Sequence, residues 1–398
     1  MLRTILFLTL LCSCFACARH RLADSQLRHV RRILSTTPIV DTHIDFPWYL
    51  VEQEQWYKPG YTAIALKNPA GDFDFERARQ GGLYGPFMSI YIPAKYQQEP
   101  GRARQVADSL IDMVQAIVRD YPDKFALAPR AADVEASFKK GIVALPMGME
   151  NGAPLEKIED VAYFHQRGIR YVTLAHSRDN RIADSSYDTL HTNGGLSDYG
   201  RQVVREMNRL GIMVDVSHLS DAAIWDVLDV AQKPLIATHS GCRHFTPGFE
   251  RNLPDTLLRA IARTNGVVQV PFSQFFLGKE VGEAWRKAGR ERSAKKIPEV
   301  GPEAEAFYRD YGKRNGEPFW ISVREVADHI DHIKNLVGID YVGLGSDFDG
   351  VGLALPPDLS DVSMYPNLLA ELLRRGYSDS DIRKICSENV LRVWRANE

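Results

Sequence analysis

Seven histidines and carboxylates of this sequence each stand at, or just beyond, the end of a short apolar run. They are His43, Asp45, Glu150, His176, His218, His239 and Asp347. Imidazole and carboxylate groups are ligands that Zn²⁺ and similar divalent cations prefer. Two such cations need about five or six protein ligands, and a shared carboxylate can bridge them while they polarise a carbonyl group. The residue types therefore predict a two-metal hydrolytic centre.

His43 and Asp45 form the first pair of this set. They are two residues apart, so on a strand both side chains point to the same face. A His-x-Asp pair alone is a weak signal, because such residues are often structural. Repetition of the pattern after other apolar runs is harder to explain structurally, since unpaired polar groups inside a closed fold are costly. Glu150 is the natural bridging carboxylate.

Other candidates have simpler explanations. His329 and His332 are three apart on a charged helix face, where surface or helix-packing roles are expected rather than metal binding. Asp349 follows Asp347 by two residues and competes with it for the same role. Asp347 is favoured because it comes first after the apolar run.

Short apolar runs alternate with amphipathic segments along the chain. Strands are expected over residues 38–45, 141–148, 170–175, 211–217, 234–238, 266–271 and 341–345. Such continuous runs indicate strands buried on both faces, as in a parallel sheet. Helices are expected over 199–210, which ends at Gly211, and over 323–337. The alternation predicts an α/β fold, a (β/α)₈ TIM-type barrel, in which the C-terminal ends of all strands meet on one rim. The metal site is expected on that rim.

The composition is that of a globular protein. Of 398 residues, 44% are hydrophobic and 25% are charged, which excludes a collagen-like or wholly disordered chain. Forty-nine Lys and Arg residues against 51 Asp and Glu residues leave a formal charge of −2, so no nucleic-acid partner is expected. No apolar run reaches the ~18 residues of a membrane span.

The first 17 residues read as a signal peptide. Arg3 precedes a short apolar run that ends in small residues and cysteines. The run resembles a bacterial lipobox, in which either Cys14 or Cys17 is the lipidated residue. We expect an exported protein, tethered to a bacterial membrane only by lipid and facing the periplasm or the cell exterior.

Residues 18–398 are expected to form one domain with a charged, solvated and partly helical insertion at about 279–318. Interleaved Glu residues argue against nucleic-acid binding by this insertion. The domain keeps two cysteines, Cys242 and Cys386. One disulfide between them and two buried thiols are the open alternatives.

The sequence resembles the membrane (renal) dipeptidases, zinc peptidases on a (β/α)₈ barrel, over about residues 30–393. The segments that carry the resemblance are VDTHIDFPW (40–48), RYVTLAH (170–176), VDVSH (214–218), RNLPD (251–255) and GSDFDG (345–350). The resemblance implies two zinc ions and hydrolysis of dipeptides of L-Xaa-L-Xaa and L-Xaa-D-Xaa type. It also raises a homodimer as a partner, because animal members dimerise through a disulfide. The insertion is longer than in animal members and could alter the rim and the choice of substrate.

The resemblance also implies residue roles. His43 and Asp45 match ligands of the first zinc, His218 and His239 match ligands of the second, and Glu150 matches the bridge, which also acts in catalysis. Three further residues match substrate-handling positions. His176 matches the histidine that stabilises the oxyanion, Arg251 the arginine that binds the C-terminal side of the substrate, and Asp347 the acidic residue that binds substrate and transfers protons.

Two other functions stay open at this point. The first is another two-metal amidohydrolase, such as a deaminase, lactonase or cyclic amidase. Those enzymes usually begin with His-x-His and often bridge their metals with a carboxylated Lys, whereas this sequence has His43-Ile44-Asp45 and Glu150. The second is a non-catalytic surface lipoprotein, which would be expected to have lost some of the ligands.

Overall fold

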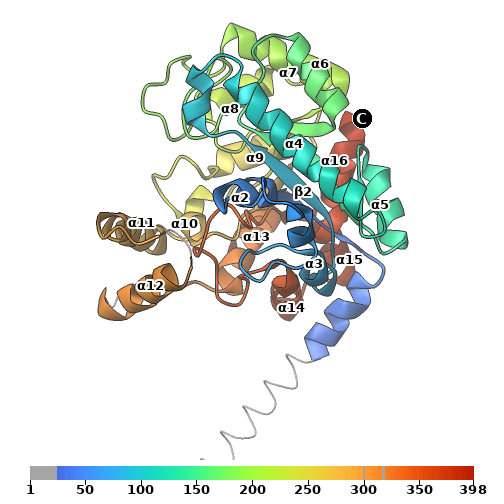
Figure 1. Cartoon of the computed structure of the whole chain (residues 1–398), viewed down its shortest axis with the longest axis vertical. Coiled ribbons are helices and arrows are strands. Elements are labelled where there is room, and N and C mark those ends of the chain that lie inside the picture. Colours follow the sequence, from blue (N-terminus) through green and yellow to red (C-terminus); the bar gives the residue numbers. More distant parts are fainter. Residues whose placement is uncertain (1–24, 299–300, 316–318) are drawn as a thin grey trace, which may run out of the picture.

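The computed structural model describes residues 25–298, 301–315 and 319–398. The predicted signal peptide and lipobox cysteines lie outside these residues. The described chain is a parallel eight-stranded barrel surrounded by helices (Figure 1). None of the helices in the described ranges combines the length and the apolarity needed to cross a membrane. The predicted (β/α)₈ fold is therefore confirmed.

Every strand of the barrel runs parallel to its neighbours. In spatial order the strands are β1 (Ile39–Ile44), β2 (Leu83–Tyr91), β5 (Met147–Glu150), β6 (Ile169–Thr173), β7 (Met213–Asp215), β8 (Ile236–Ala237), β9 (Val267–Val270) and β10 (Val342–Leu344). Hydrogen bonds between β1 and the segment after β10 close the ring: Asp45 N donates to Phe348 O at 2.9 Å, and Asp347 N donates to His43 O at 3.1 Å. Closure brings the first and last strand ends of the chain together.

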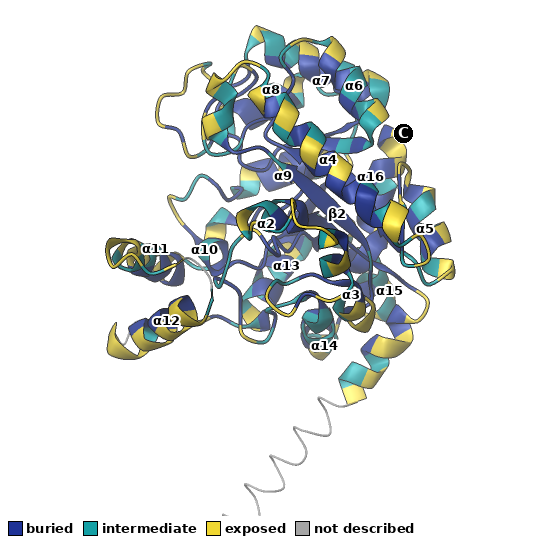
Figure 2. Ribbon diagram, in the orientation of Figure 1, coloured by how far each residue is buried: buried dark blue, intermediate teal, exposed yellow. Residues whose placement is uncertain are grey.

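The helices alternate with these strands and cover the outside of the barrel. They are α2 (Phe46–Glu52), α3 (Phe75–Gly81), α4 (Arg102–Asp120), α5 (Ala131–Lys139), α6 (Glu159–Arg167), α7 (Asp198–Leu210), α8 (Asp221–Val230), α9 (Asp255–Arg263), α10 (Gln274–Leu277), α11 (Lys279–Ala294), α12 (Pro302–Asn315), α13 (Val323–Val337), α14 (Tyr365–Arg374), α15 (Asp379–Arg383) and α16 (Asn389–Asn397). A further helix covers residues 25–34. In Figure 2, strand β2 is coloured as buried, whereas the surrounding helices carry both buried and exposed residues.

Both predicted helices form where local signals begin and end them. Ser197 accepts a hydrogen bond from Gly200 N at the start of α7, and Gly211 ends that helix at φ 84°. At the start of α13, Ser322 and Glu325 form a reciprocal capping box. The predictions for 199–210 and 323–337 are confirmed to within one residue.

One strand prediction needs correction and one barrel strand was missed, and a proline lies in each of the two segments. The expected strand over 141–148 is two strands, because the chain breaks at Pro146: β4 (Val143–Leu145) pairs with β3 (Phe125–Leu127) outside the barrel, and only β5 belongs to the barrel. Strand β2 was not among the expected strands; Pro86 lies within its apolar run, and a proline is unusual in a central strand.

The predicted insertion contains α11 and α12, which project from one side of the barrel (Figure 1). Their outer faces are exposed, but the segment has its own aromatic core. Trp285 is 1% exposed and stacks on Tyr308 (4.5 Å between ring centroids) and on Phe319 (4.6 Å). This core fixes α11 at the edge of the rim, directly after β9 and α10.

The cysteines and helix histidines whose roles the sequence left undecided are packed within the protein. Cys242 and Cys386 are free and buried, so the two-thiol alternative holds and no bridge joins them. His329 is fully buried, and its Nδ1 accepts a hydrogen bond from Cys242 N at 2.9 Å. His332 contacts Asp255 at 2.7 Å and stacks on His244. These histidines have packing roles, as expected.

Candidate metal centre

Glu150 lies at the centre of a buried histidine cluster at the C-terminal rim. Its Oε2 is 3.4 Å from His43 Nε2. Its Oε1 is 3.2 Å from His218 Nε2, 3.4 Å from His239 Nε2 and 3.5 Å from His176 Nε2. One carboxylate therefore faces four imidazoles with two different oxygens, which is the arrangement that a bridging ligand requires.

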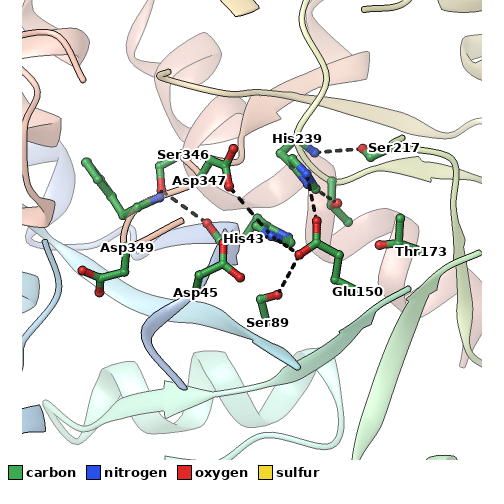
Figure 3. A network of polar contacts seen from close by, with 12 residues as sticks. His43, Asp45, Ser89, Glu150, Thr173, Ser217, His239, Ser346, Asp347 and Asp349 are labelled. Atoms are coloured by element: carbon green, nitrogen blue, oxygen red, sulfur yellow. Dashed lines mark hydrogen bonds and ion pairs between the residues drawn. The ribbon is translucent and has the colours of Figure 1, made fainter. Parts of the chain in front are cut away.

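Asp45 completes the first side of the cluster. Its Oδ2 is 3.3 Å from His43 Nε2 (Figure 3). Three sets of ligand atoms each lie within 4.8 Å of one another: His43, Asp45 and Glu150; Glu150, His218 and His239; and His43, His239 and Asp347. The first two sets share Glu150.

The donor atoms fit a pair of divalent cations. His43 Nε2 and Asp45 Oδ1 are buried and have no hydrogen-bond partner among the described residues. His218 Nε2 and His239 Nε2 face each other at 2.7 Å. Buried polar atoms are normally paired, so unpaired nitrogen and carboxylate donors that converge on one space are typical of a zinc site.

The barrel places these donors because each stands at the end of a strand. His43 is in β1, Asp45 follows it, and Glu150 ends β5. The others lie two or three residues beyond the ends of β6, β7, β8 and β10. His218 and Asp347 have left-handed backbone conformations, at φ 68° and φ 69°. Non-glycine residues rarely adopt this conformation, which costs of order 1–3 kcal/mol and is found where function requires a side-chain direction.

Asp215, in β7, orients the second pair of histidines. Its carboxylate accepts hydrogen bonds from Thr173 Oγ1 (2.5 Å), Thr238 N (2.9 Å), Thr238 Oγ1 (2.7 Å) and Ser217 N (3.0 Å). Because the Thr238 hydroxyl proton goes to Asp215, the hydroxyl oxygen accepts from His239 Nδ1 at 2.8 Å. The Nε2 lone pair of His239 is thereby left facing Glu150, the tautomer that a metal ligand needs.

Tyr171 lies behind His43, on the side of its Nδ1 atom. Its hydroxyl lies 3.0 Å from His43 Nδ1, so that Nε2 faces Asp45 and Glu150. The ring crosses the barrel interior above Gly148, where a Cβ would stand 2.0 Å from the ring. Glycine at 148 is what lets the phenol reach His43.

Asp41 joins the first strand of the barrel to the segment that follows the last strand. It accepts hydrogen bonds from His43 N (2.9 Å), Ser346 N (3.0 Å) and Tyr365 Oη (2.5 Å). Burial raises the pKa of Asp41 to about 6, against the effect of these donors. The Asp41 carboxylate therefore fixes the backbone at His43 and at Ser346, the residue before Asp347.

Burial and neighbouring charges set the protonation of the cluster. Burial opposes a charged Glu150, but His43, His176 and hydrogen bonds with His218 and His239 hold its pKa well below the ordinary value. Burial, reinforced by Arg251, lowers the pKa of His218 well below the ordinary value. For His239, burial and then His43 act in the same direction. His218 and His239 are therefore neutral, the form in which an imidazole binds metal. Burial lowers the pKa of His43 too, but Tyr171, Glu150 and Asp45 outweigh it and hold that pKa well above the ordinary value in the metal-free cluster.

The structure separates Asp347 from Asp349. Asp347 Oδ1 is 4.0 Å from His43 Nε2, whereas Asp349 turns away from the cluster (Figure 3). Asp349 Oδ1 accepts a hydrogen bond from Asp72 N at 2.6 Å, and Asp349 N donates to Asp72 Oδ2 at 2.8 Å. Burial raises the pKa of Asp347 to about 8, although His43 opposes the shift.

His176 and Arg251 border the cluster. The His176 ring packs against His218 (4.1 Å between centroids) and Tyr91 (4.9 Å). Arg251 is 2% exposed. Its guanidinium donates to His239 O (2.8 Å) and Ser240 Oγ (3.0 Å), and lies 2.9 Å from His218 Nε2. Within the described ranges it forms no ion pair with a carboxylate. All eight predicted site residues thus lie around one space.

The sequence profile of the membrane dipeptidases (Peptidase family M19) matches residues 27–398. The chain belongs to this family. It is 32% identical over 387 residues, 93% of this chain and 83% of the relative, to an uncharacterised dipeptidase of Schizosaccharomyces pombe. It is 31% identical over 392 residues, 95% and 88% of the two chains, to the dipeptidase verJ of Clonostachys rogersoniana.

Solved structures agree with the family assignment. The probable dipeptidase PvdM of Pseudomonas aeruginosa superimposes with a TM-score of 0.79 at 27% identity, over 94% of this chain and 98% of that one. A metallopeptidase of Rhodobacter sphaeroides, solved with a phosphinate mimic of the dipeptide L-Ala-D-Ala, gives 0.74 at 27% identity, over 91% and 100%. The family resemblance seen in the sequence is confirmed.

Three supporting residues of this family member were not singled out from the sequence: Asp41, Tyr171 and Asp215. Two of them carry a signal that was available. Asp41 and Asp215 interrupt apolar strands with a charge, in Val40-Asp41-Thr42 and Val214-Asp215-Val216. A carboxylate on a strand buried on both faces must have several donors. Tyr171 carries no such signal, because a tyrosine in a strand is ordinary.

Proposed function

We propose that this protein is a zinc-dependent dipeptidase that hydrolyses the peptide bond of L-Xaa-L-Xaa and L-Xaa-D-Xaa dipeptides. The observation that carries the proposal is the convergence of unpaired buried donors around Glu150, next to the Arg251 guanidinium, which has no carboxylate partner among the described residues. The dipeptidase relatives, and the metallopeptidase solved with a mimic of L-Ala-D-Ala, support the same reaction.

Five residues would hold two zinc ions. His43 and Asp45 would bind the first, His218 and His239 the second, and Glu150 both. When bound, the ions would supply Lewis acidity and lower the pKa of a shared water.

Arg251 would bind and position the substrate. A buried guanidinium without a carboxylate partner favours a ligand carboxylate, and its planar fork suits two-point binding. The C-terminal carboxylate of a dipeptide provides that group. Anchoring it beside Glu150 would hold the peptide bond over the cluster, and positioning of this kind contributes strongly to rate.

His176 would stabilise the oxygen of the scissile carbonyl group. Burial lowers the pKa of His176, so its ring is neutral near pH 7 and can donate one N–H. A donor already in place where negative charge develops lowers the barrier, since it needs no rearrangement during the reaction.

Asp347 would accept a proton from the attacking water and pass it to the leaving amine. In the metal-free protein burial raises the pKa of Asp347 to about 8, close to physiological pH. A carboxyl of that kind can accept a proton during attack and release it to the leaving amine, which a carboxyl of ordinary pKa does poorly.

The test is hydrolysis of L-Ala-L-Ala, L-Ala-D-Ala and acetylated L-Ala-D-Ala, followed by detection of the released amine. We expect cleavage of the free dipeptides that needs Zn²⁺, stops with a chelator and is lost in Glu150→Gln. A folded protein that carries two zinc ions but cleaves none of them would contradict the dipeptidase proposal and indicate a different amide or lactone substrate. A folded protein without bound zinc would contradict the metal site itself.

From the sequence alone we further propose export and lipid attachment at Cys14 or Cys17. In a bacterial host, the wild-type chain should incorporate labelled palmitate. One of the two variants Cys14→Ala and Cys17→Ala should lose this labelling. Equal labelling of both variants and of the wild type would contradict attachment at either residue.

A further inference from the structure

Helix α11 brings a second arginine to the edge of the candidate site. The helix begins two elements after β9, at the C-terminal rim, which is where barrel active sites form. Arg286, in its middle, lies over the ring of Phe249, with 5.3 Å between Cζ and the ring centroid. Phe249 belongs to the loop after β8, the same loop that carries Arg251. The charged insertion therefore contacts the substrate-binding loop.

A stacked pair of rings connects the two arginines. Phe249 and Phe276 are nearly parallel, at 12° and 6.2 Å between centroids. Arg251 lies 5.1 Å from the Phe276 centroid, and Arg286 lies over Phe249. Each guanidinium thus contacts one ring of the pair.

Tyr187 extends this wall to the metal cluster. Its ring is 6.2 Å from Phe249 and 5.9 Å from His218. The Tyr187 ring therefore borders both the cluster and the ring over which Arg286 lies.

A small cavity of about 130 Å³ lies beside Arg286, between Phe249 and Phe275. At ~30 Å³ per water molecule it has room for a carboxylate and its hydration. Three charged side chains line it: Lys279, Arg286 and Glu283. In the part of the chain that the structure describes, Arg286 forms no ion pair, so the cavity keeps an excess of positive charge.

We infer that Arg286 forms a subsite for a second substrate carboxylate, and that the preferred dipeptides carry Asp or Glu at the C-terminal position. This inference rests on the proposed dipeptidase function. The α-carboxylate would bind Arg251, and the acidic side chain would extend across the Phe249–Phe276 pair to Arg286. Neutral dipeptides would be cleaved without this contact.

The experiment compares kcat/KM for L-Ala-L-Glu with that for L-Ala-L-Gln, which has the same shape without the charge. The wild type should prefer L-Ala-L-Glu about fivefold, the ratio of one partly exposed ion pair of ~1 kcal/mol. Arg286→Gln should abolish the preference without changing kcat/KM for L-Ala-L-Gln. Raising the salt concentration from 20 mM to 500 mM should reduce the wild-type preference, because exposed charges are screened.

Arg290→Gln is the matched control. It removes the same charge one turn further along α11, away from Phe249, and should keep the wild-type ratio. Arg286→Glu should reverse selectivity in favour of L-Ala-L-Lys, a result that loss of folding cannot produce. Equal rates on the Glu and Gln dipeptides in the wild type, or an unchanged ratio in Arg286→Gln, would overturn the subsite while leaving the dipeptidase function intact. Absence of cleavage of all dipeptides, L-Ala-L-Ala included, would overturn the proposed function and the subsite with it.

Discussion

Thr238→Val should weaken one of the two proposed zinc sites and leave the other unchanged. Valine keeps the shape of threonine but lacks the hydroxyl, which donates to Asp215 at 2.7 Å and accepts from His239 Nδ1 at 2.8 Å. The variant therefore leaves Nδ1 of His239, a residue only 1% exposed, without a partner. It also removes the contact that selects the tautomer of the ring.

Two magnitudes follow from these contacts. Loss of a partner behind a ligating histidine typically lowers metal affinity about 10–100-fold, which corresponds to ~1.4–2.7 kcal/mol. An unpaired buried donor costs ~1–3 kcal/mol of folding free energy. We therefore expect one zinc-binding step weakened about 10–100-fold, and metal-free protein destabilised by ~1–3 kcal/mol.

Zinc affinity is measured by competition with a chromophoric chelator, and stability by urea unfolding of the metal-free protein. Thr238→Ser restores the hydroxyl and should restore both quantities. Tyr171→Phe removes the partner of His43 Nδ1 at 3.0 Å and should weaken the other step. Wild-type affinity for both zinc ions in Thr238→Val, or equal losses in the Ser and Val variants, would refute the role of the hydroxyl.

Three other substitutions give distinct outcomes. Asp347→Asn should lower kcat about 10²–10⁴-fold, the usual contribution of a proton-transfer group. Metal analysis should still find two zinc ions in this variant, and a wild-type kcat would exclude Asp347 from proton transfer. Asp72→Asn should raise the melting temperature of the metal-free protein at pH 8 but not near pH 4. Burial raises the folded-state pKa of Asp72 to about 7 from 3.8, so the wild type loses stability as pH rises between these values and the neutral amide does not; a pH-independent difference would contradict this. Trp285→Ala should lower the local stability of the α11–α12 segment by about 3–5 kcal/mol, which faster hydrogen exchange in that segment would show. The variant should also lose the preference for L-Ala-L-Glu while it still cleaves L-Ala-L-Ala. Unchanged exchange in that segment would show that the stacked rings around Trp285 do not stabilise it.

Most strand ends could be predicted from the sequence because they depend on local patterns. An apolar run followed by His or Asp marks both a buried strand and the group that its end presents. The prediction failed where a proline made the local pattern ambiguous: Pro86 masked β2, and Pro146 divides a run whose halves belong to different sheets. Which sheet a short strand joins depends on partners distant in sequence, which no local window contains.

The sequence by itself determined the kinds of donor atoms, their places at strand ends and, through its motifs, the family. Only the tertiary structure decided which donors share Glu150, that Asp347 rather than Asp349 faces the cluster, that Asp215 acts through Thr238 on His239, and that Arg286 contacts Phe249. These are contacts between residues far apart along the chain, such as Ser346 and Asp41, separated by 305 positions. They exist because closure of the barrel brings all strand ends to one rim, and closure depends on the packing of the whole chain.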